Sequence, residues 1–104
     1  MIKVSVMYPK TEGSHFDIDY YRDTHMPLVE KHLKSKGLVK TSIDKGIGGG
    51  APGQPPEYHC IGMLYFESEA VFREVMPPVS PILRGDIPNF TNVQPLRWIS
   101  EVVE

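Results

Sequence analysis

The sequence predicts an α+β fold of the ferredoxin-like βαββαβ type, with a four-stranded antiparallel sheet and two helices. Three observations lead to this fold. Segments with strand and helix periodicity follow one another in the order strand, helix, strand, strand, helix, strand. The chain has 104 residues, which suit one domain and are too few for two. The predicted strands also carry apolar side chains on both faces, so something besides the helices must cover the sheet.

The first half is predicted to form a strand and a long helix. Residues 2–8 alternate between two faces, and Pro9 ends the strand. Asp17 is the expected N-cap of the helix, which ends near Gly37. One helical stripe joins Ile18, Tyr21, His25, Leu28 and His32. Because Pro27 lacks a backbone N–H, the helix must kink there or restart with the proline in its first turn.

The second half is predicted to supply the other three strands and a shorter helix. We expect Ser68 to cap that helix and Pro77 and Pro78 to end it. The remaining predicted elements are, in order, a weak strand at 38–47, a mobile glycine- and proline-rich loop at 48–56, a strongly apolar strand at 58–66, a short helical turn at 81–85 and a strand at 93–103.

Composition narrows the class of protein. The chain has 11 basic and 13 acidic residues, and a net charge of −2 gives no basic field for nucleic acid or an anionic membrane. No segment approaches the roughly 20 apolar residues of a membrane span. Cys60 is the only cysteine, so no internal disulfide can form, which favours a reducing compartment. We therefore expect a cytoplasmic protein with no nucleic-acid or membrane partner.

The second face of the sheet predicts a homodimer. Its candidate apolar residues are Met7, Ile61 or Cys60, Met63 or Leu64, and Trp98 or Ile99. With two helices on one face, a partner sheet is the simplest cover for the other.

His25 is the candidate catalytic residue. It lies centrally on the apolar stripe, and an imidazole facing an apolar layer must be hydrogen-bonded or it costs free energy. One interpretation is a structural histidine bonded to the backbone. The other is a small-molecule site beside the Pro27 kink, with Tyr8, Tyr21, Phe90 and Trp98 as ligand-binding residues.

Metal and thiol chemistry are not expected. On a helix His25 and His32 would lie ~10 Å apart, too far to share one ion. Cys60 sits within an apolar strand and is interpreted as a small buried side chain. We predict no metal site and no cofactor.

A sequence motif covers the region 8–28. It consists of Tyr8-Pro9, Phe16-Asp17, Tyr20-Tyr21, and His25 with Pro27 and Leu28. This motif resembles the EthD family of the dimeric α+β-barrel superfamily, and Asp86, Phe90 and Thr91 resemble its C-terminal part more loosely. The resemblance implies one EthD-like domain over 1–104 and a homodimer whose sheets form a barrel.

The resemblance also implies a range of functions. The family is named for a protein linked to ethyl tert-butyl ether degradation, and similar proteins are associated with polyketide or aromatic metabolism. This suggests a cofactor-independent enzyme that oxygenates, cyclises, decarboxylates or isomerises a small hydrophobic molecule, with His25 as general acid or base. Two alternatives stay open: a non-catalytic carrier or accessory protein, and a haem-binding protein with His25 as axial ligand.

Overall fold

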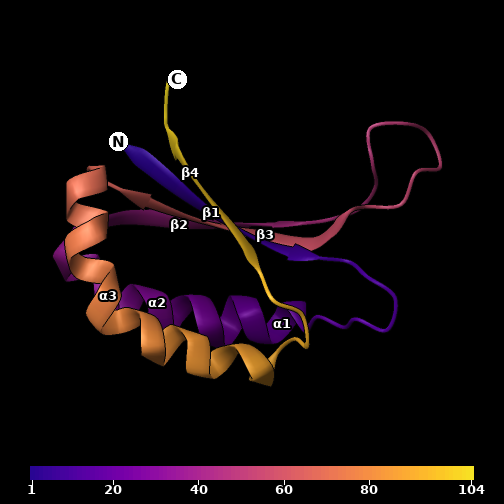
Figure 1. Cartoon of the computed structure of the whole chain (residues 1–104), viewed down its shortest axis with the longest axis horizontal. Helices are drawn as coiled ribbons and strands as arrows, with labels where there is room; N and C mark the ends of the chain where they lie inside the picture. The colour runs from indigo at the N-terminus through magenta and orange to yellow at the C-terminus, as the bar shows by residue number, and fades with distance from the viewer.

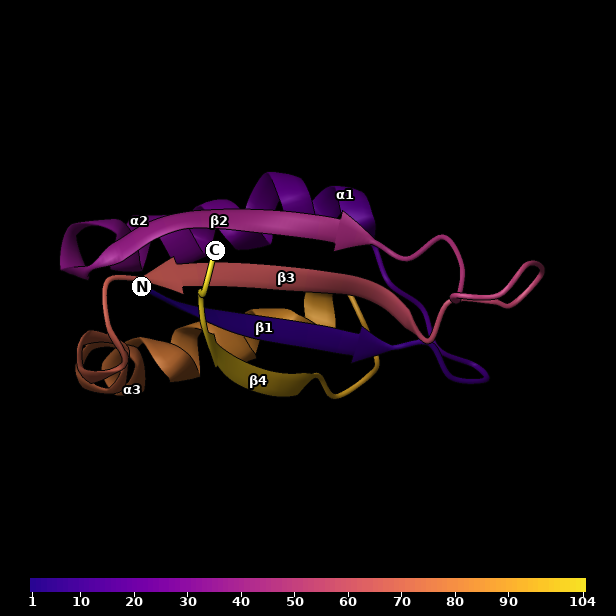
Figure 2. The same cartoon turned by 90° about the horizontal axis from the view of Figure 1, so that it is seen from above.

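A four-stranded antiparallel sheet forms the centre of the molecule. The computed structural model describes residues 1–104. Its strands are β1 (Ile2–Pro9), β2 (Leu38–Lys45), β3 (Tyr58–Phe66) and β4 (Leu96–Glu101), in the spatial order β2-β3-β1-β4. Figure 2 shows β1 and β3 at the centre of the sheet, with β2 and β4 at its edges. The predicted ferredoxin-like fold is confirmed.

All helices lie on one face of this sheet (Figure 1). The first helical segment is continuous and consists of α1 (Ile18–Tyr20), a π-helical turn (Tyr21–His25), α2 (Met26–Leu33) and a 3₁₀ turn (Lys34–Lys36). The second is α3 (Glu69–Asp86), followed by a 3₁₀ turn (Ile87–Asn89). The core lies between these helices and the sheet, where Val4 pairs with Leu64 and Tyr8 with Cys60 on the inner face.

Both predicted N-caps are confirmed. The Asp17 carboxylate accepts a hydrogen bond from the Tyr20 N–H, and the Ser68 hydroxyl accepts one from the Val71 N–H. The first helical segment ends at Gly37, whose φ of 109° lies in the left-handed region that favours glycine.

The π-helical turn corrects the predicted stripe. The Met26 N–H bonds to the carbonyl of Tyr21, five residues back, so this turn holds one residue more than an α-helical turn. Tyr21 and His25 face the sheet as predicted, but the buried face then moves on by one residue. Val29 and Leu33 are buried in place of Leu28 and His32. Pro27 falls in the first turn of α2, as one of the two sequence alternatives required.

The predicted end of the second helix at Pro77 is wrong. Helix α3 runs for 18 residues, through Pro77, Pro78 and Pro81, and absorbs the separate turn expected at 81–85. The three prolines are exposed, so water can pair with the carbonyls that lose a helical donor. Figure 1 shows α3 bending along its length, as proline-containing helices do.

The remaining boundaries differ by a few residues. Strand β2 ends at Lys45 rather than at residue 47, and β4 begins at Leu96 rather than at residue 93, because Pro95 lacks an N–H for the sheet ladder. The loop 46–57 contains no strand or helix and extends beyond the end of the sheet in Figure 1. No helix has the length and apolar character needed to cross a bilayer.

Candidate functional site

The local structure around His25 turns its imidazole inward. Asp17 caps the start of α1, and the π-helical turn then places both Tyr21 and His25 against the sheet. The two residues are only 1% and 5% exposed, respectively. π-Helical turns within α-helices are frequent at functional sites.

His25 is hydrogen-bonded to Asp86, the last residue of α3. The distance between His25 Nδ1 and Asp86 Oδ2 is 2.8 Å. Asp86 Oδ1 accepts two more hydrogen bonds, from the Tyr20 hydroxyl at 2.7 Å and the Asn89 amide at 3.0 Å. The carboxylate is therefore held by three donors and cannot easily rotate away from the imidazole.

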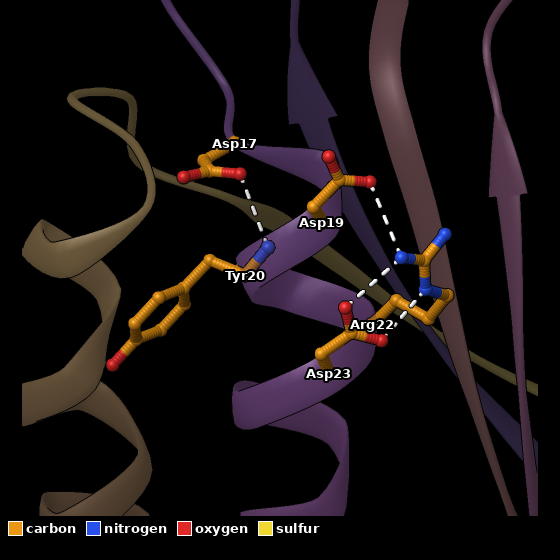
Figure 3. A network of polar contacts seen from close by, with 5 residues as sticks. All are labelled: Asp17, Asp19, Tyr20, Arg22 and Asp23. Atoms are coloured by element: carbon orange, nitrogen blue, oxygen red, sulfur yellow. Dashed lines mark hydrogen bonds and ion pairs between the residues drawn. The ribbon is translucent and has the colours of Figure 1, made fainter.

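The other side of α1 and the π-helical turn carries a separate polar network (Figure 3). Arg22 pairs with Asp23 at 2.8 Å and with Asp19 at 3.3 Å, and all three side chains are exposed. Such exposed pairs contribute little stability. Figure 3 shows the Tyr20 ring pointing away from this network toward α3, where its hydroxyl meets Asp86.

The surroundings of His25 and Asp86 determine which of the two side chains is charged at neutral pH. Burial lowers the pKa of His25 below its usual 6.5, although the hydrogen bond and charge of Asp86 act in the opposite direction. Burial alone would raise the pKa of Asp86, but the hydrogen bonds from Tyr20, Asn89 and His25 outweigh it and lower the pKa. At pH 7 the imidazole is neutral and the carboxylate ionised. Because a carboxylate only accepts, Nδ1 carries the proton and Nε2 is the basic nitrogen.

Aromatic rings fix the plane of the imidazole. Tyr21 stacks on His25 with a centroid distance of 5.2 Å, and Phe90 packs against it at 4.7 Å. Tyr8 contacts both Tyr21 and Phe90 edge-on. These contacts leave the ring little freedom to turn.

A cavity of about 190 Å³ lies between the sheet and the helices and is lined by His25. Its other lining residues are Val4, Val6, Tyr8, Tyr21, Met26, Val29, Leu64, Phe72, Met76, Ser80, Leu83, Arg84, Ile87 and Arg97. The wall is mostly apolar, with two phenols, one imidazole and two guanidinium groups. Concave, mostly apolar sites with a few converging polar groups are typical of small-molecule binding.

The basic nitrogen of His25 remains open to this space. No protein group bonds to Nε2, and no buried side-chain nitrogen or oxygen lacks a hydrogen-bond partner. Nε2 must therefore be accessible, and the surrounding space is the cavity that His25 lines.

The predicted ligand-binding residues are only partly brought together. Tyr8 and Tyr21 line the cavity, whereas Phe90 lies behind His25 and supports its ring. Trp98 does not line the cavity, contrary to the prediction. It lies opposite Ser5 on the outer face of the sheet and is 61% exposed. Side chains alternate along a strand, so its neighbour Arg97 points toward the helices instead.

Two residues of the candidate site were missed by reasoning from pattern alone. Asp86 and Tyr20 complete the polar network at His25. The only sequence signal for them is the motif itself, which contains the Tyr20-Tyr21 pair and, in its looser C-terminal part, Asp86.

The environment of Cys60 and the placement of possible metal ligands bear on thiol and metal chemistry. Cys60 is fully buried, and burial raises the pKa of its thiol to about 12, so it is not a thiolate at neutral pH. The fold brings no three histidine, cysteine or acidic side chains together as a metal site.

Comparison with known proteins identifies the family. The EthD domain model matches residues 14–94. An EthD-like protein from Ralstonia eutropha JMP134 is 41% identical, with a TM-score of 0.92, over 99% of this chain and 92% of that one. No curated protein matches the chain.

More distant structures share the fold alone. An ethyl tert-butyl ether degradation (EthD) family protein from Bacillus halodurans C-125 is 19% identical, with a TM-score of 0.65 and 99% of both chains covered. A dimeric ferredoxin-like protein from an uncultured marine organism is 12% identical, with a TM-score of 0.59, over 100% of this chain and 96% of that one. The matched motif, the near-complete coverage and the 41% identity together place this chain in the EthD family.

Proposed function

We propose that the chain is a small-molecule enzyme in which His25 transfers protons as a general base and acid, without a cofactor. The hydrogen bond of 2.8 Å between His25 Nδ1 and Asp86, at the wall of an apolar cavity, carries this proposal. It leaves a neutral imidazole with its basic nitrogen facing the ligand space, which is the resting state that a general base needs.

The proposed reaction begins with proton abstraction. Nε2 takes a proton from an activated C–H or O–H group of the bound molecule, and the resulting imidazolium is stabilised by the adjacent Asp86 carboxylate. The same proton then returns to another atom of the molecule, which regenerates neutral His25. Isomerisation and cyclisation need only this transfer. In a decarboxylation His25 would first take up a proton from water and then deliver it to the carbon atom that loses CO₂.

The buried phenols supply hydrogen-bond donors for the same site. Burial raises the pKa of Tyr8 to about 12 and raises the pKa of Tyr21 well above 10. Both therefore stay protonated. Because the two hydroxyls also interact with each other, one proton is shared within the pair and the other can be donated to an oxygen on which negative charge develops. The cavity of about 190 Å³ is smaller than the ~300–1,000 Å³ of typical drug-sized pockets, which favours a molecule of one or two rings.

The test uses a generic probe of a base in an apolar pocket, 5-nitrobenzisoxazole. Removal of its ring C–H proton breaks the N–O bond and releases a coloured nitrophenolate. We expect the wild-type protein to accelerate this ring opening, and His25→Gln to lower the rate at least about tenfold. His32→Gln is the matched control, because His32 lies on α2 and outside the cavity wall.

Other outcomes discriminate the alternatives. An unchanged rate in His25→Gln contradicts the general-base role. Saturable binding of the probe without ring opening supports the carrier alternative, and a Soret absorption band in the purified protein supports haem binding.

We also propose that two copies pair through the outer faces of their sheets. Leu96 and Trp98 are 53% and 61% exposed on this face, and Met7, Ile61 and Met63 lie beside them in register. A patch of this kind on one surface is self-complementary about a two-fold axis. The marine ferredoxin-like protein of similar fold is described as dimeric, which supports a dimer here.

A further inference from the structure

Two arginines line the cavity without any acidic partner. Arg84 comes from the last turn of α3 and Arg97 from β4, and both are exposed whereas most of the wall is buried. They therefore lie at the open side of the cavity. In Figure 2, β4 is the sheet edge on the α3 side, so residues of these two elements can reach one opening.

The other two arginines of the chain behave differently. Arg22 pairs with Asp19 and Asp23, and Arg73 pairs with Glu69, all on the outer surface. Arg84 and Arg97 form no ion pair and no side-chain hydrogen bond, and the cavity wall contains no carboxylate. The chain as a whole is acidic, with a net charge of −2, so this local excess of positive charge runs against its composition.

Structural roles explain each arginine singly but not their convergence. A cation in the last turn of α3 complements the helix dipole, and a charge on an edge strand discourages edge-to-edge pairing with another sheet. Neither role requires the side chain to line a cavity. The inner-face position of Arg97, opposite Val6, and the effect of its charge on the buried Tyr8 place it toward the ligand space.

We propose that the ligand of this cavity is a small carboxylate with an apolar body, held at the opening by Arg84 and Arg97. This inference rests on the proposed function in assuming that the cavity is the ligand site. A guanidinium presents a planar pair of donors that matches a carboxylate, and an unpaired one is free to do so.

The arrangement also orients the molecule. The apolar body would contact Val4, Val29 and Leu64 on the cavity wall, while the carboxylate stays at the partly hydrated opening. Held in this way, the molecule presents its uncharged part to His25. Charge recognition and proton transfer are therefore assigned to different residues of one site.

The experiment compares 2-naphthoate with 2-naphthamide, which has nearly the same shape but no charge. Both are titrated into the protein by isothermal titration calorimetry at low and at moderate salt. We expect the acid to bind at least about tenfold more tightly than the amide, because only the acid can form charge-assisted hydrogen bonds with both guanidinium groups. Added salt should weaken binding of the acid alone.

Substitutions assign the effect to the two arginines. Arg84→Gln with Arg97→Gln should bring the acid to the affinity of the amide and leave the amide unchanged. Arg73→Gln, on the same helix but paired with Glu69, is the matched control and should leave both affinities unchanged. Equal affinities for acid and amide in the wild type overturn this inference, while the ring-opening test still decides the proposed function. Failure of both compounds to bind overturns the cavity as a ligand site, and the inference with it.

Discussion

At the scale of single residues, Asp86 organises the site. Its carboxylate accepts from His25, Tyr20 and Asn89, so it fixes both the tautomer of the imidazole and its position. It also opposes the effect of burial on the pKa of His25, which would otherwise be lower still. The strength of His25 as a base therefore depends on Asp86.

Asp86→Asn should weaken catalysis while keeping the fold. An asparagine oxygen can still accept from Nδ1, but it removes the charge that stabilises the imidazolium. We expect ring opening of 5-nitrobenzisoxazole at pH 7.5 to fall about 10–100-fold, with the midpoint of the pH–rate profile moved to lower pH. A profile identical to that of the wild type would show that Asp86 does not act on His25.

His25 should also make the protein less stable in mild acid. Burial lowers the pKa of folded His25 below its unfolded value near 6.5, so between these values the unfolded chain binds more protons. The free energy of unfolding should therefore decrease as pH falls below about 6.5. Comparing Tm at pH 7.5 and 5.0, we expect a smaller decrease in His25→Gln than in the wild type, and an unaltered decrease in His32→Gln.

For the pair of His25 and Asp86, the sequence pattern predicts the position of His25 but not that of Asp86. The helical stripe is a local pattern and correctly turns His25 inward. Asp86 lies 61 residues away, and its approach depends on the path of α3, which no local periodicity describes. Trp98 and Arg97 could not be assigned to the correct faces for a similar reason. The register of β4 with β1 decides which side chains of this short strand point toward the helices, and that register is not visible in the local sequence.

At the scale of elements, the π-helical turn connects sequence to site. Its additional residue lets Tyr21 and His25 face the sheet while Val29 and Leu33 do so further along. In a regular α-helix the first and last of these residues, Tyr21 and Leu33, would point about 120° apart. The turn therefore reconciles the inward position of His25 with a well-packed helix.

Deleting Thr24 should separate these two roles. Thr24 is exposed within the π-helical turn, and its removal would leave an α-helical turn with Met26 four positions after Tyr21. We expect the buried faces before and after the turn to be retained and Tm to change little. His25 would then lie three rather than four residues after Tyr21, which disturbs the stacking of the two rings and lowers the rate of ring opening. Thr24→Ala, which keeps the length, should retain the activity. A cooperative fold with full activity after the deletion would contradict this role for the turn.

Helix α3 shows why element boundaries could not all be predicted. Its prolines are a strong local stop signal, yet their exposed positions let water replace the missing helical donors. Packing of Phe72 and Val79 against the core holds the helix together across them. Where tertiary contacts agree with local signals, as in β3 and at the caps Asp17 and Ser68, the sequence predictions are confirmed.

At the scale of the whole molecule, the two faces of the sheet differ in what they contact. The inner face supplies Tyr8 and Arg97 to the wall of the cavity. The outer face carries apolar side chains at its centre, with Lys3 and Lys40 placed against the ring of Tyr65 toward one end. The apolar centre is available for a partner while the charged end stays hydrated.

The outer face leads to the last prediction, that Trp98→Arg converts a dimer into a monomer. Light scattering of the wild-type protein at micromolar concentration should give twice the chain mass of 11.7 kDa. In the variant, two copies of a new guanidinium would have to enter the apolar interface without partners, and such unpaired burial destabilises association strongly. Ile82→Arg is the matched control, since Ile82 is 46% exposed on α3, away from the sheet, and should leave the mass unchanged. A wild-type mass of one chain, or a dimer that survives Trp98→Arg, would rule out pairing through this face. Ring opening by the monomeric variant would then show whether the cavity, which one chain lines by itself, works without its partner.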